Sequence, residues 1–266
     1  MTAVRGTTVD ITTQDGAVDA YFVRPDGDGP YPAVLFYMDA FGPRPHLRAM
    51  ADRLAGAGYA VLLPNVFHRE GRAPLFDLPD FIDPGARPEL WDRILPVMLA
   101  LTPDLAVRDA AAYLTWLADS PHTTDGPVGV TGYCMGAALA LRTASAFPER
   151  VAAVGGFHGG RLATDAPDSP HLTVERITAE VYLGFADNDS SMPPEQIELL
   201  DRTLTEAGVT HRTEVYPGAS HGYTQADTAA YDAEAAERHW TALLDLLDRT
   251  LVRPVADSGT PGRPES

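Results

Sequence analysis

The sequence predicts an α/β fold with a mostly parallel, doubly wound sheet and flanking helices. Three observations support this class. Short apolar segments alternate with longer amphipathic stretches along most of the chain, as they do where helices connect parallel strands. Most of these apolar segments are continuous, which is typical of strands covered on both faces. A glycine-flanked turn at residues 132–136 separates one such segment from an alanine-rich helix.

The chain opens with an expected β-hairpin. Residues Thr7–Ile11 and Val18–Val23 alternate in polarity like half-buried strands around the turn signal Gln14-Asp15-Gly16. The strands that follow are predicted at the continuous apolar segments, which are Ala33–Tyr37, Tyr59–Leu63, Val128–Thr131, Val151–Val154 and Val181–Phe185.

Amphipathic helices are expected between most of these strands, at Pro45–Ala57, Leu105–Asp119, Met135–Phe147, Pro194–Ala207 and Ala229–Thr250. The interval 65–101 is too long for a simple connection and holds a further expected helix over Arg87–Ala100. It is predicted to be a cap or a wall of the binding pocket. Residues 1–252 are expected to form a single domain. Residues 253–266 have no apolar period and are expected to be a flexible tail.

Composition narrows the class of function. The chain has 266 residues, of which 45% are hydrophobic and one is a cysteine. Its formal net charge of −17 argues against a nucleic-acid partner, because phosphates would be repelled. No apolar run approaches the ~18 residues of a membrane span, and no secretion signal is recognised. A cytoplasmic protein without a membrane partner is therefore expected, and the oligomeric state is left open.

The stretch Gly132-Tyr133-Cys134-Met135-Gly136 has the form of a nucleophile elbow that carries a cysteine. In such an elbow a strand turns sharply into a helix, and the glycines let the backbone approach closely while the central side chain projects into a cleft. The helix also directs free backbone N–H groups at whatever the nucleophile attacks. Cys134 is therefore the candidate nucleophile, although a lone cysteine can also be a small buried hydrophobic residue.

A cysteine nucleophile needs a base, and the base needs an orienting acid. In this type of site the chain order is nucleophile, acid, histidine, each on a loop after a strand. Asp187 and Asp189 follow the strand that ends near Ala186, and His221 lies among small residues after His211–Tyr216. His221 is the candidate base, and either aspartate can be the acid.

Three motifs together resemble the dienelactone hydrolase family of α/β-hydrolases. They are Gly132-Tyr-Cys-Met-Gly136, the loop Asp189-x-x-x-Pro193 and the turn Pro217-Gly-Ala-Ser-His221-Gly222, and the likeness covers roughly residues 7–250. The resemblance implies an α/β-hydrolase fold and a triad of Cys134, His221 and Asp189 that works without a cofactor. The spacing from Asp189 to Pro193 matches the family loop and favours Asp189 over Asp187.

The segment Asp39-Ala40-Phe41-Gly42 follows the third strand, where this fold places its second oxyanion donor. Its likeness to the family's acidic-residue-then-Phe-Gly turn implies that the N–H groups of Ala40 and Met135 form the oxyanion hole. The same likeness gives Asp39 the position of a glutamate that contacts the resting thiol and controls its ionisation. A carboxylate disfavours a nearby thiolate and an imidazolium favours one, so the resting charge of Cys134 is left open.

Other residues are weaker candidates. The candidate pocket residues, each of which can equally belong to the core or to a loop, are His158, Trp91, Tyr223 and Gln225. The remaining histidines lack the spacing of metal ligands, so no metal site is expected. The arginines expected to be solvated surface rather than an anion clamp are Arg44, Arg69, Arg72 and Arg87.

One position departs from the family pattern. Relatives that cleave dienelactone hold its carboxylate with arginines, one of them four residues after the triad histidine, and that position is Gln225 here. Residues 65–101 offer no arginine that can be assigned to the other contact. The departure argues against dienelactone itself as the substrate and leaves the reaction type unchanged.

The expected function is the hydrolysis of a small-molecule ester or lactone through a thioester acyl-enzyme. Two alternatives share the fold. One is a non-catalytic ligand-binding module, or a redox sensor built on Cys134. The other is acyl transfer or thioester hydrolysis on the same triad, because fold and triad do not choose the acceptor.

Overall fold

The computed structural model describes residues 2–83 and 88–252. Within them, eight strands form one sheet in the order β1-β2-β4-β3-β5-β6-β7-β8. The strands are β1 (Val4–Thr13), β2 (Gly16–Pro25), β3 (Ala33–Tyr37), β4 (Ala60–Pro64), β5 (Val128–Tyr133), β6 (Val151–Phe157), β7 (Glu180–Asn188) and β8 (His211–Ser220). The expected tail at 253–266 and Arg87 lie outside the described residues.

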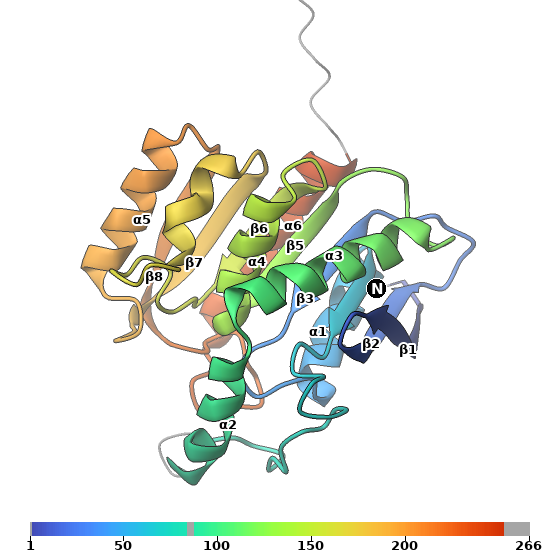
Figure 1. The fold of residues 1–266 in the computed structure, drawn as a ribbon, viewed down its shortest axis with the longest axis horizontal. Helices are drawn as coiled ribbons and strands as arrows, with labels where there is room; N and C mark the ends of the chain where they lie inside the picture. The colour runs from blue at the N-terminus through green and yellow to red at the C-terminus, as the bar shows by residue number, and fades with distance from the viewer. Residues whose placement is uncertain (1, 84–87, 253–266) are drawn as a thin grey trace, which may run out of the picture.

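The first two strands are antiparallel to their neighbours and the others are parallel. β1 pairs with β2 as the predicted hairpin, and β2 pairs antiparallel with β4. From β4 to β8, each strand runs parallel to the next one in the sheet. The predicted α/β class and its mostly parallel sheet are therefore confirmed (Figure 1).

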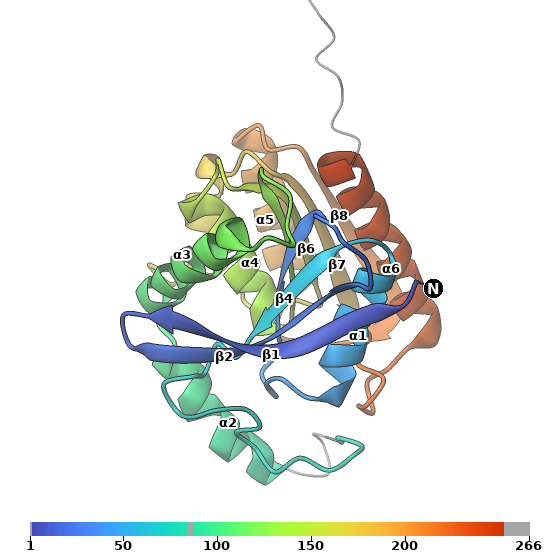
Figure 2. The same ribbon diagram turned by 90° about the vertical axis from the view of Figure 1, so that its right-hand side faces the viewer.

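Helices cover both faces of the sheet. They are α1 (Pro45–Gly56), α2 (Pro88–Ala100), α3 (Pro103–Asp119), α4 (Met135–Ala146), α5 (Pro194–Glu206) and α6 (Ala233–Leu247), with a 3₁₀ helix at Pro170–Arg176 and a π-helical turn at Asp248–Val252. Helices α1 and α6 lie on one face, and α3, α4 and α5 lie on the other (Figure 2). In the described ranges, none of the helices combines the length and apolarity needed to cross a bilayer.

The central strands are buried throughout. Every residue of β3, β4 and β5 is buried, as the continuous apolar segments predict for strands covered on both faces. Because β5 lies between β3 and β6, its carboxyl end lies in the central part of the edge at which the parallel strands end. The candidate nucleophile follows that end directly.

Two helices begin at residues other than those predicted, because capping side chains set their first turns. Helix α3 starts after Thr102, whose hydroxyl accepts a hydrogen bond from the N–H of Leu105. Helix α6 starts after Asp232, whose carboxylate accepts one from the N–H of Ala235 at 3.0 Å. A side-chain acceptor satisfies an N–H that has no carbonyl one turn earlier, so it determines where the helix begins.

The interval 65–101 crosses the end of the sheet and finishes in α2, which projects beyond the strands (Figure 1). Trp91 of α2 packs on Phe41, with ring centroids 5.8 Å apart. Earlier in the interval, Ile82 forms a bridge with Thr228. The interval therefore borders both the turn after β3 and the loop after β8.

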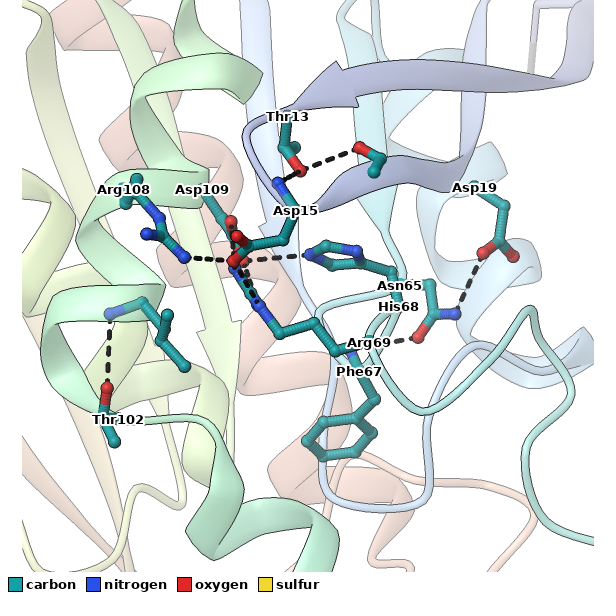
Figure 3. A network of polar contacts seen from close by, with 12 residues as sticks. Thr13, Asp15, Asp19, Asn65, Phe67, His68, Arg69, Thr102, Arg108 and Asp109 are labelled. Atoms are coloured by element: carbon teal, nitrogen blue, oxygen red, sulfur yellow. Dashed lines mark hydrogen bonds and ion pairs between the residues drawn. The ribbon is translucent and has the colours of Figure 1, made fainter.

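A buried polar network fastens the start of this interval to α3 and to the hairpin (Figure 3). Asp109 of α3 accepts two hydrogen bonds from Arg69, both 2.7 Å, and lies 3.3 Å from Nε2 of His68. Arg69 also donates to Asp15 in the hairpin turn at 2.8 Å. The side chain of Arg69 is only 21% exposed, so the expectation that it is solvated surface was wrong. Burial raises the pKa of Asp109, but hydrogen bonds from His68 and Arg69 outweigh this and lower it.

The network predicts a large cost for replacing Asp109 with Ala. The Arg69 cation and His68 would lose a buried acceptor, and the free energy of unfolding is expected to fall by about 3–5 kcal/mol in chemical denaturation. Asp10→Ala is the matched control, because Asp10 pairs with Arg72 at the surface and their side chains are 57% and 59% exposed. That variant should change stability by less than about 1 kcal/mol. Similar losses in both variants would contradict the role given to Asp109.

Candidate active site

The turn between β5 and α4 holds Cys134 in a strained backbone conformation. Its φ of 56° and ψ of −119° are uncommon for residues that carry a Cβ. The flanking glycines allow the chain to turn so tightly, because a Cβ on Gly132 would lie 2.0 Å from the carbonyl oxygen of Gly136. A Cβ on Gly136 would lie 2.6 Å from the carbonyl oxygen of Met38. The chain thus turns sharply from strand to helix with Cys134 at the tip.

Helix α6 holds the elbow in place through a contact with Tyr133. The hydroxyl of Tyr133 lies 3.0 Å from Nε2 of His239, and Nδ1 of His239 lies 2.8 Å from the carbonyl oxygen of Ala236. A carbonyl can only accept, so Nδ1 carries the proton and Nε2 accepts from the hydroxyl. Burial lowers the pKa of His239 to about 3, so the ring is neutral.

Asp189 and His221 meet because β7 and β8 are parallel neighbours whose carboxyl ends share one sheet edge. Oδ2 of Asp189 lies 2.6 Å from Nδ1 of His221. The backbone N–H and the hydroxyl of Ser191 donate to Oδ1 of Asp189 at 2.9 and 2.6 Å. The Asp189 side chain is 3% exposed and that of His221 is 32% exposed. The carboxylate is therefore enclosed, while the imidazole reaches solvent.

Asp187, the other candidate acid, has a different partner. Its Oδ2 accepts a hydrogen bond of 2.9 Å from the backbone N–H of Gly218. Asp187 therefore stabilises the end of β8, and Asp189 is the carboxylate that contacts the imidazole.

Charge in the site favours a protonated His221. Burial lowers the pKa of His221, but its interactions with Cys134 and its hydrogen bond with Asp189 raise it well above its usual range. Burial raises the pKa of Asp189, but its hydrogen bonds with His221 and Ser191 lower it overall. Cys134, His221 and Asp189 therefore form one line of interacting groups with the imidazole in the middle.

A cleft of about 720 Å³ reaches all three of these side chains. Its other walls come from α2, the start of α3, one face of α4 and the loops after β6 and β7. Among the described residues, no three His, Cys, Asp or Glu side chains gather as metal ligands would. The cleft therefore brings a thiol, an imidazole and a carboxylate together in a mostly apolar enclosure.

The turn after β3 lies beside the start of α4, because Gly136 packs directly on the end of β3. Ala40 lies in this turn and is 1% exposed. Asp39 shapes the turn, since its Oδ1 accepts from the N–H of Phe41 at 2.9 Å. Met135 is the first residue of α4, where backbone N–H groups have no carbonyl one turn earlier. The two expected oxyanion donors therefore belong to adjacent backbone segments.

The carboxylate of Asp39 pairs with Arg44, where the family likeness had implied the thiol. Arg44 donates to the two carboxylate oxygens of Asp39 at 2.7 and 2.9 Å. It also donates to Asp227 at 2.5 and 3.1 Å and to Oε1 of Gln225 at 3.1 Å. Arg44 is only 7% exposed, so the expectation that it is solvated surface was wrong. A forked cation satisfies both oxygens of a buried carboxylate, which a thiol cannot do.

Arg44 therefore joins two parts of the site. It links the turn that carries Ala40 to the loop that follows His221, through contacts that span 181 and 183 residues of sequence. Two carboxylates share this one cation, and their side chains are 4% and 17% exposed. We call this cluster of Asp39, Arg44, Gln225 and Asp227 the Arg44 clamp.

Three predicted pocket residues lie behind the cleft. His158 and Tyr223 have no exposed surface and Gln225 is 2% exposed, and none of them lines the cleft. The expectation that they are pocket residues was therefore wrong, because the chain after His221 turns back into the core and His158 packs behind the His221 ring. Trp91 does line the cleft, as expected.

His158 supports His221 from behind. The two rings meet edge-on with centroids 5.3 Å apart, and Nε2 of His158 lies 2.8 Å from the hydroxyl of Thr224. Burial and the positive charge of His221 lower the pKa of His158 well below its usual range. The positive charge of this histidine pair therefore belongs to His221.

Two arginines that line the cleft were not predicted. Arg142 lies on the same face of α4 as Met135 and Leu139, at helical spacings of three and four residues, and this periodicity is a signal that could have identified it. Arg161 follows β6 with a φ of 56°, and no sequence pattern places its side chain in the cleft.

Several known proteins resemble this chain in sequence and in fold. The Dienelactone hydrolase family model matches residues 18–251 of the chain. The carboxymethylenebutenolidase of Rhodococcus opacus is 28% identical over 222 residues, covering 82% of this chain and 81% of its own. A Synechocystis sp. protein named for the same activity is 28% identical over 254 residues, covering 93% and 98%. A Klebsiella pneumoniae crystal structure named for dienelactone hydrolase superposes with a TM-score of 0.81 at 24% identity, covering 93% and 99%.

Because His239 is buried and neutral next to the elbow, we expect the stability of the protein to fall in acid. Above the ordinary histidine pKa of ~6.5 the ring is neutral in both folded and unfolded chains, so its favourable contacts are fully present. Below it the unfolded chain binds a proton that the folded chain does not, and stability falls with pH until about 3. His239→Phe should remove up to about 1.4 kcal/mol per pH unit from the slope of unfolding free energy between pH 6.5 and 4. Parallel curves for the variant and the parent protein would refute the assignment.

Proposed function

The chain belongs to the dienelactone hydrolase family, and we propose that Cys134, His221 and Asp189 are the catalytic triad with which it cleaves esters or lactones. Family membership makes the chain a hydrolase of carboxylic esters or lactones. One observation carries the proposed triad. A thiol at the tip of an elbow, an imidazole that interacts with it and a carboxylate 2.6 Å from the imidazole all line one cleft.

The first step is attack by sulfur. The Cys134 thiolate forms a bond to the carbonyl carbon, and the π electron pair moves to the carbonyl oxygen. The N–H groups of Ala40 and Met135 hold this oxyanion, and a single donor in such a role is typically worth ~3 kcal/mol. The start of α4 adds the partial positive charge of a helix N-terminus.

The second step expels the alcohol. The electron pair on oxygen returns to carbon, the bond to the alkoxy oxygen breaks, and imidazolium His221 gives its proton to that oxygen. The raised pKa of His221 keeps this proton available until the leaving group needs it. The products are a free alcohol and a thioester on Cys134. In a lactone the alcohol stays attached to the acyl group.

Water then regenerates the enzyme. Neutral His221 takes a proton from water as the water oxygen attacks the thioester carbonyl. When the tetrahedral intermediate collapses, the C–S bond breaks and sulfur leaves as the thiolate beside imidazolium. Asp189 holds the imidazole with Nδ1 protonated and so directs Nε2 to the reacting atoms.

Four broader features complete the proposal. Residues 1–252 act as a single α/β-hydrolase domain, supported by the continuous sheet from β1 to β8. The interval 65–101 supplies a wall of the substrate cleft. The substrate is a small molecule, and the cytoplasm is the proposed location because a reducing compartment keeps a lone thiol nucleophile reduced.

Exchange of triad residues tests the proposal. Cys134→Ala and Asp189→Asn should each lower kcat/KM for p-nitrophenyl acetate by about 10³-fold or more, because the nucleophile or the orientation of its base is lost. The melting temperature should change little for Cys134→Ala. Intact-protein mass spectrometry during turnover should find an acyl group on the parent protein and none on Cys134→Ala.

Asp187→Asn is the matched control for Asp189→Asn. Its carboxylate lies two residues away and binds only a backbone N–H, so kcat/KM should stay within a few-fold of the parent value. Full activity in Cys134→Ala would reject the proposed nucleophile. Equal losses in the two aspartate variants would reject Asp189 as the orienting acid.

The Arg44 clamp predicts a second effect on kcat. Arg44→Lys keeps the charge but cannot bind Asp39, Gln225 and Asp227 together. The turn that carries Ala40 should then shift, and kcat is expected to fall roughly 10- to 100-fold with a smaller change in KM. Arg69→Lys, in the network around Asp109, is the control and should keep kcat. A larger loss in the Arg69 variant would show that the effect is general destabilisation.

A further inference from the structure

We infer that the ester cleaved at this site carries a bulky apolar group, alkyl or aryl, that binds along a wall formed by α2 and α4. The inference rests on the proposed function, because it takes Cys134 as the point at which the ester reacts. The apolar wall consists of Trp91, Met98 and Leu99 of α2, Leu101, and Met135 and Leu139 of α4.

In the part of the chain that the structure describes, the wall carries apolar surface that is exposed to solvent. Leu99 is 71% exposed and Trp91 is 37% exposed, although both line the same cleft as Cys134. Single exposed apolar residues are ordinary, but apolar residues gathered beside a reactive group mark a ligand-binding surface. A hydrocarbon chain or ring lying on Leu99 would remove this surface from water.

The volume of the cleft also favours an ester with a bulky group. Its volume of about 720 Å³ lies within the ~300–1,000 Å³ of pockets that enclose drug-sized ligands. A short ester such as an acetate would fill only the part of it next to Cys134. On the α2 side, most of the remaining space lies against the apolar side chains of Trp91, Met98, Leu99 and Leu101.

The sheet order separates this wall from the polar side of the cleft. Trp91 packs on Phe41, which follows β3, so α2 lies on the β3 side of Cys134. The charged lining residues Arg161 and Asp168 lie in the loop after β6, on the other side of β5. Arg142, the other cleft arginine, donates to the carbonyl oxygen of Asp168 and so belongs to that loop. An ester across Cys134 therefore has one apolar side and one polar side.

Relatives that cleave dienelactone hold its carboxylate with an arginine four residues after the triad histidine. The corresponding position here does not face the cleft. Gln225 is 2% exposed, accepts from Arg44 and donates to the hydroxyl of Thr224 at 3.0 Å. Its amide is thus fully engaged behind the cleft. The arrangement favours hydrophobic burial over charge pairing as the source of binding energy on the α2 side.

Chain-length profiles of the purified enzyme test the inference. Two ester series would be measured, p-nitrophenyl esters from acetate to hexanoate and acetates of alcohols from methanol to hexanol. In at least one series kcat/KM should rise with each methylene, by up to roughly fourfold. Flat or falling profiles in both series, with Cys134-dependent hydrolysis of the acetates intact, would overturn the inference and leave the proposed function standing. Absence of hydrolysis of every ester would overturn both.

Two leucines on one stripe of α2 give a matched pair of variants. Leu99 lines the cleft, whereas Leu95, one turn earlier and 49% exposed, does not. Leu99→Asn should reduce the ratio of kcat/KM for the longest ester to that for the acetate by roughly three- to tenfold, and Leu99→Met should restore it. Leu95→Asn should leave the ratio unchanged. Equal ratios in Leu99→Asn, Leu95→Asn and the parent protein would show that α2 does not hold the apolar group.

Discussion

The contact of Gly136 with the carbonyl oxygens of Tyr37 and Met38 is the constraint on which the rest of the site depends. A Cβ at this position would lie 2.6–2.7 Å from those oxygens, so only glycine lets α4 begin against the end of β3. That approach sets Cys134 at the tip of its turn and brings the turn containing Ala40 beside the first N–H groups of α4. The backbone thus places the proposed nucleophile and the proposed oxyanion donors together.

Two separate groups of charged residues lie around this turn. In the first, His221 lies between the sulfur of Cys134 and the carboxylate of Asp189, and interactions with both favour the imidazolium. In the second, Arg44 pairs with the carboxylates of Asp39 and Asp227 and ties the turn that carries Ala40 to the loop after His221. Because His158 stays neutral behind His221, the positive charge of this histidine pair lies on His221.

The two sides of the cleft differ because different segments of the chain lie on the two sides of β5. On the β3 side, the interval 65–101 is fastened by the Asp109 network and ends in α2, whose apolar residues reach the cleft. On the β6 side, the segment after β6 carries the charged lining residues Arg161 and Asp168. The groups around Cys134 therefore come from the ends of the central strands, whereas the two sides of the cleft come from the segments that connect the strands.

The sheet class, the elbow and the candidate reacting groups could all be predicted from the sequence. These features follow from local rules: continuous apolar segments give parallel strands, glycine spacing gives the turn around Cys134, and chain order brings Asp189 and His221 to one sheet edge. Contacts in the folded chain were needed to show that Arg44 binds Asp39, that His158 and Gln225 lie behind the cleft, and that Leu99 lines it. Burial and pairing depend on the distance between residues far apart in the chain, as between Arg44 and Gln225, which are separated by 181 positions. Periodicity and turn chemistry carry no information about such distances.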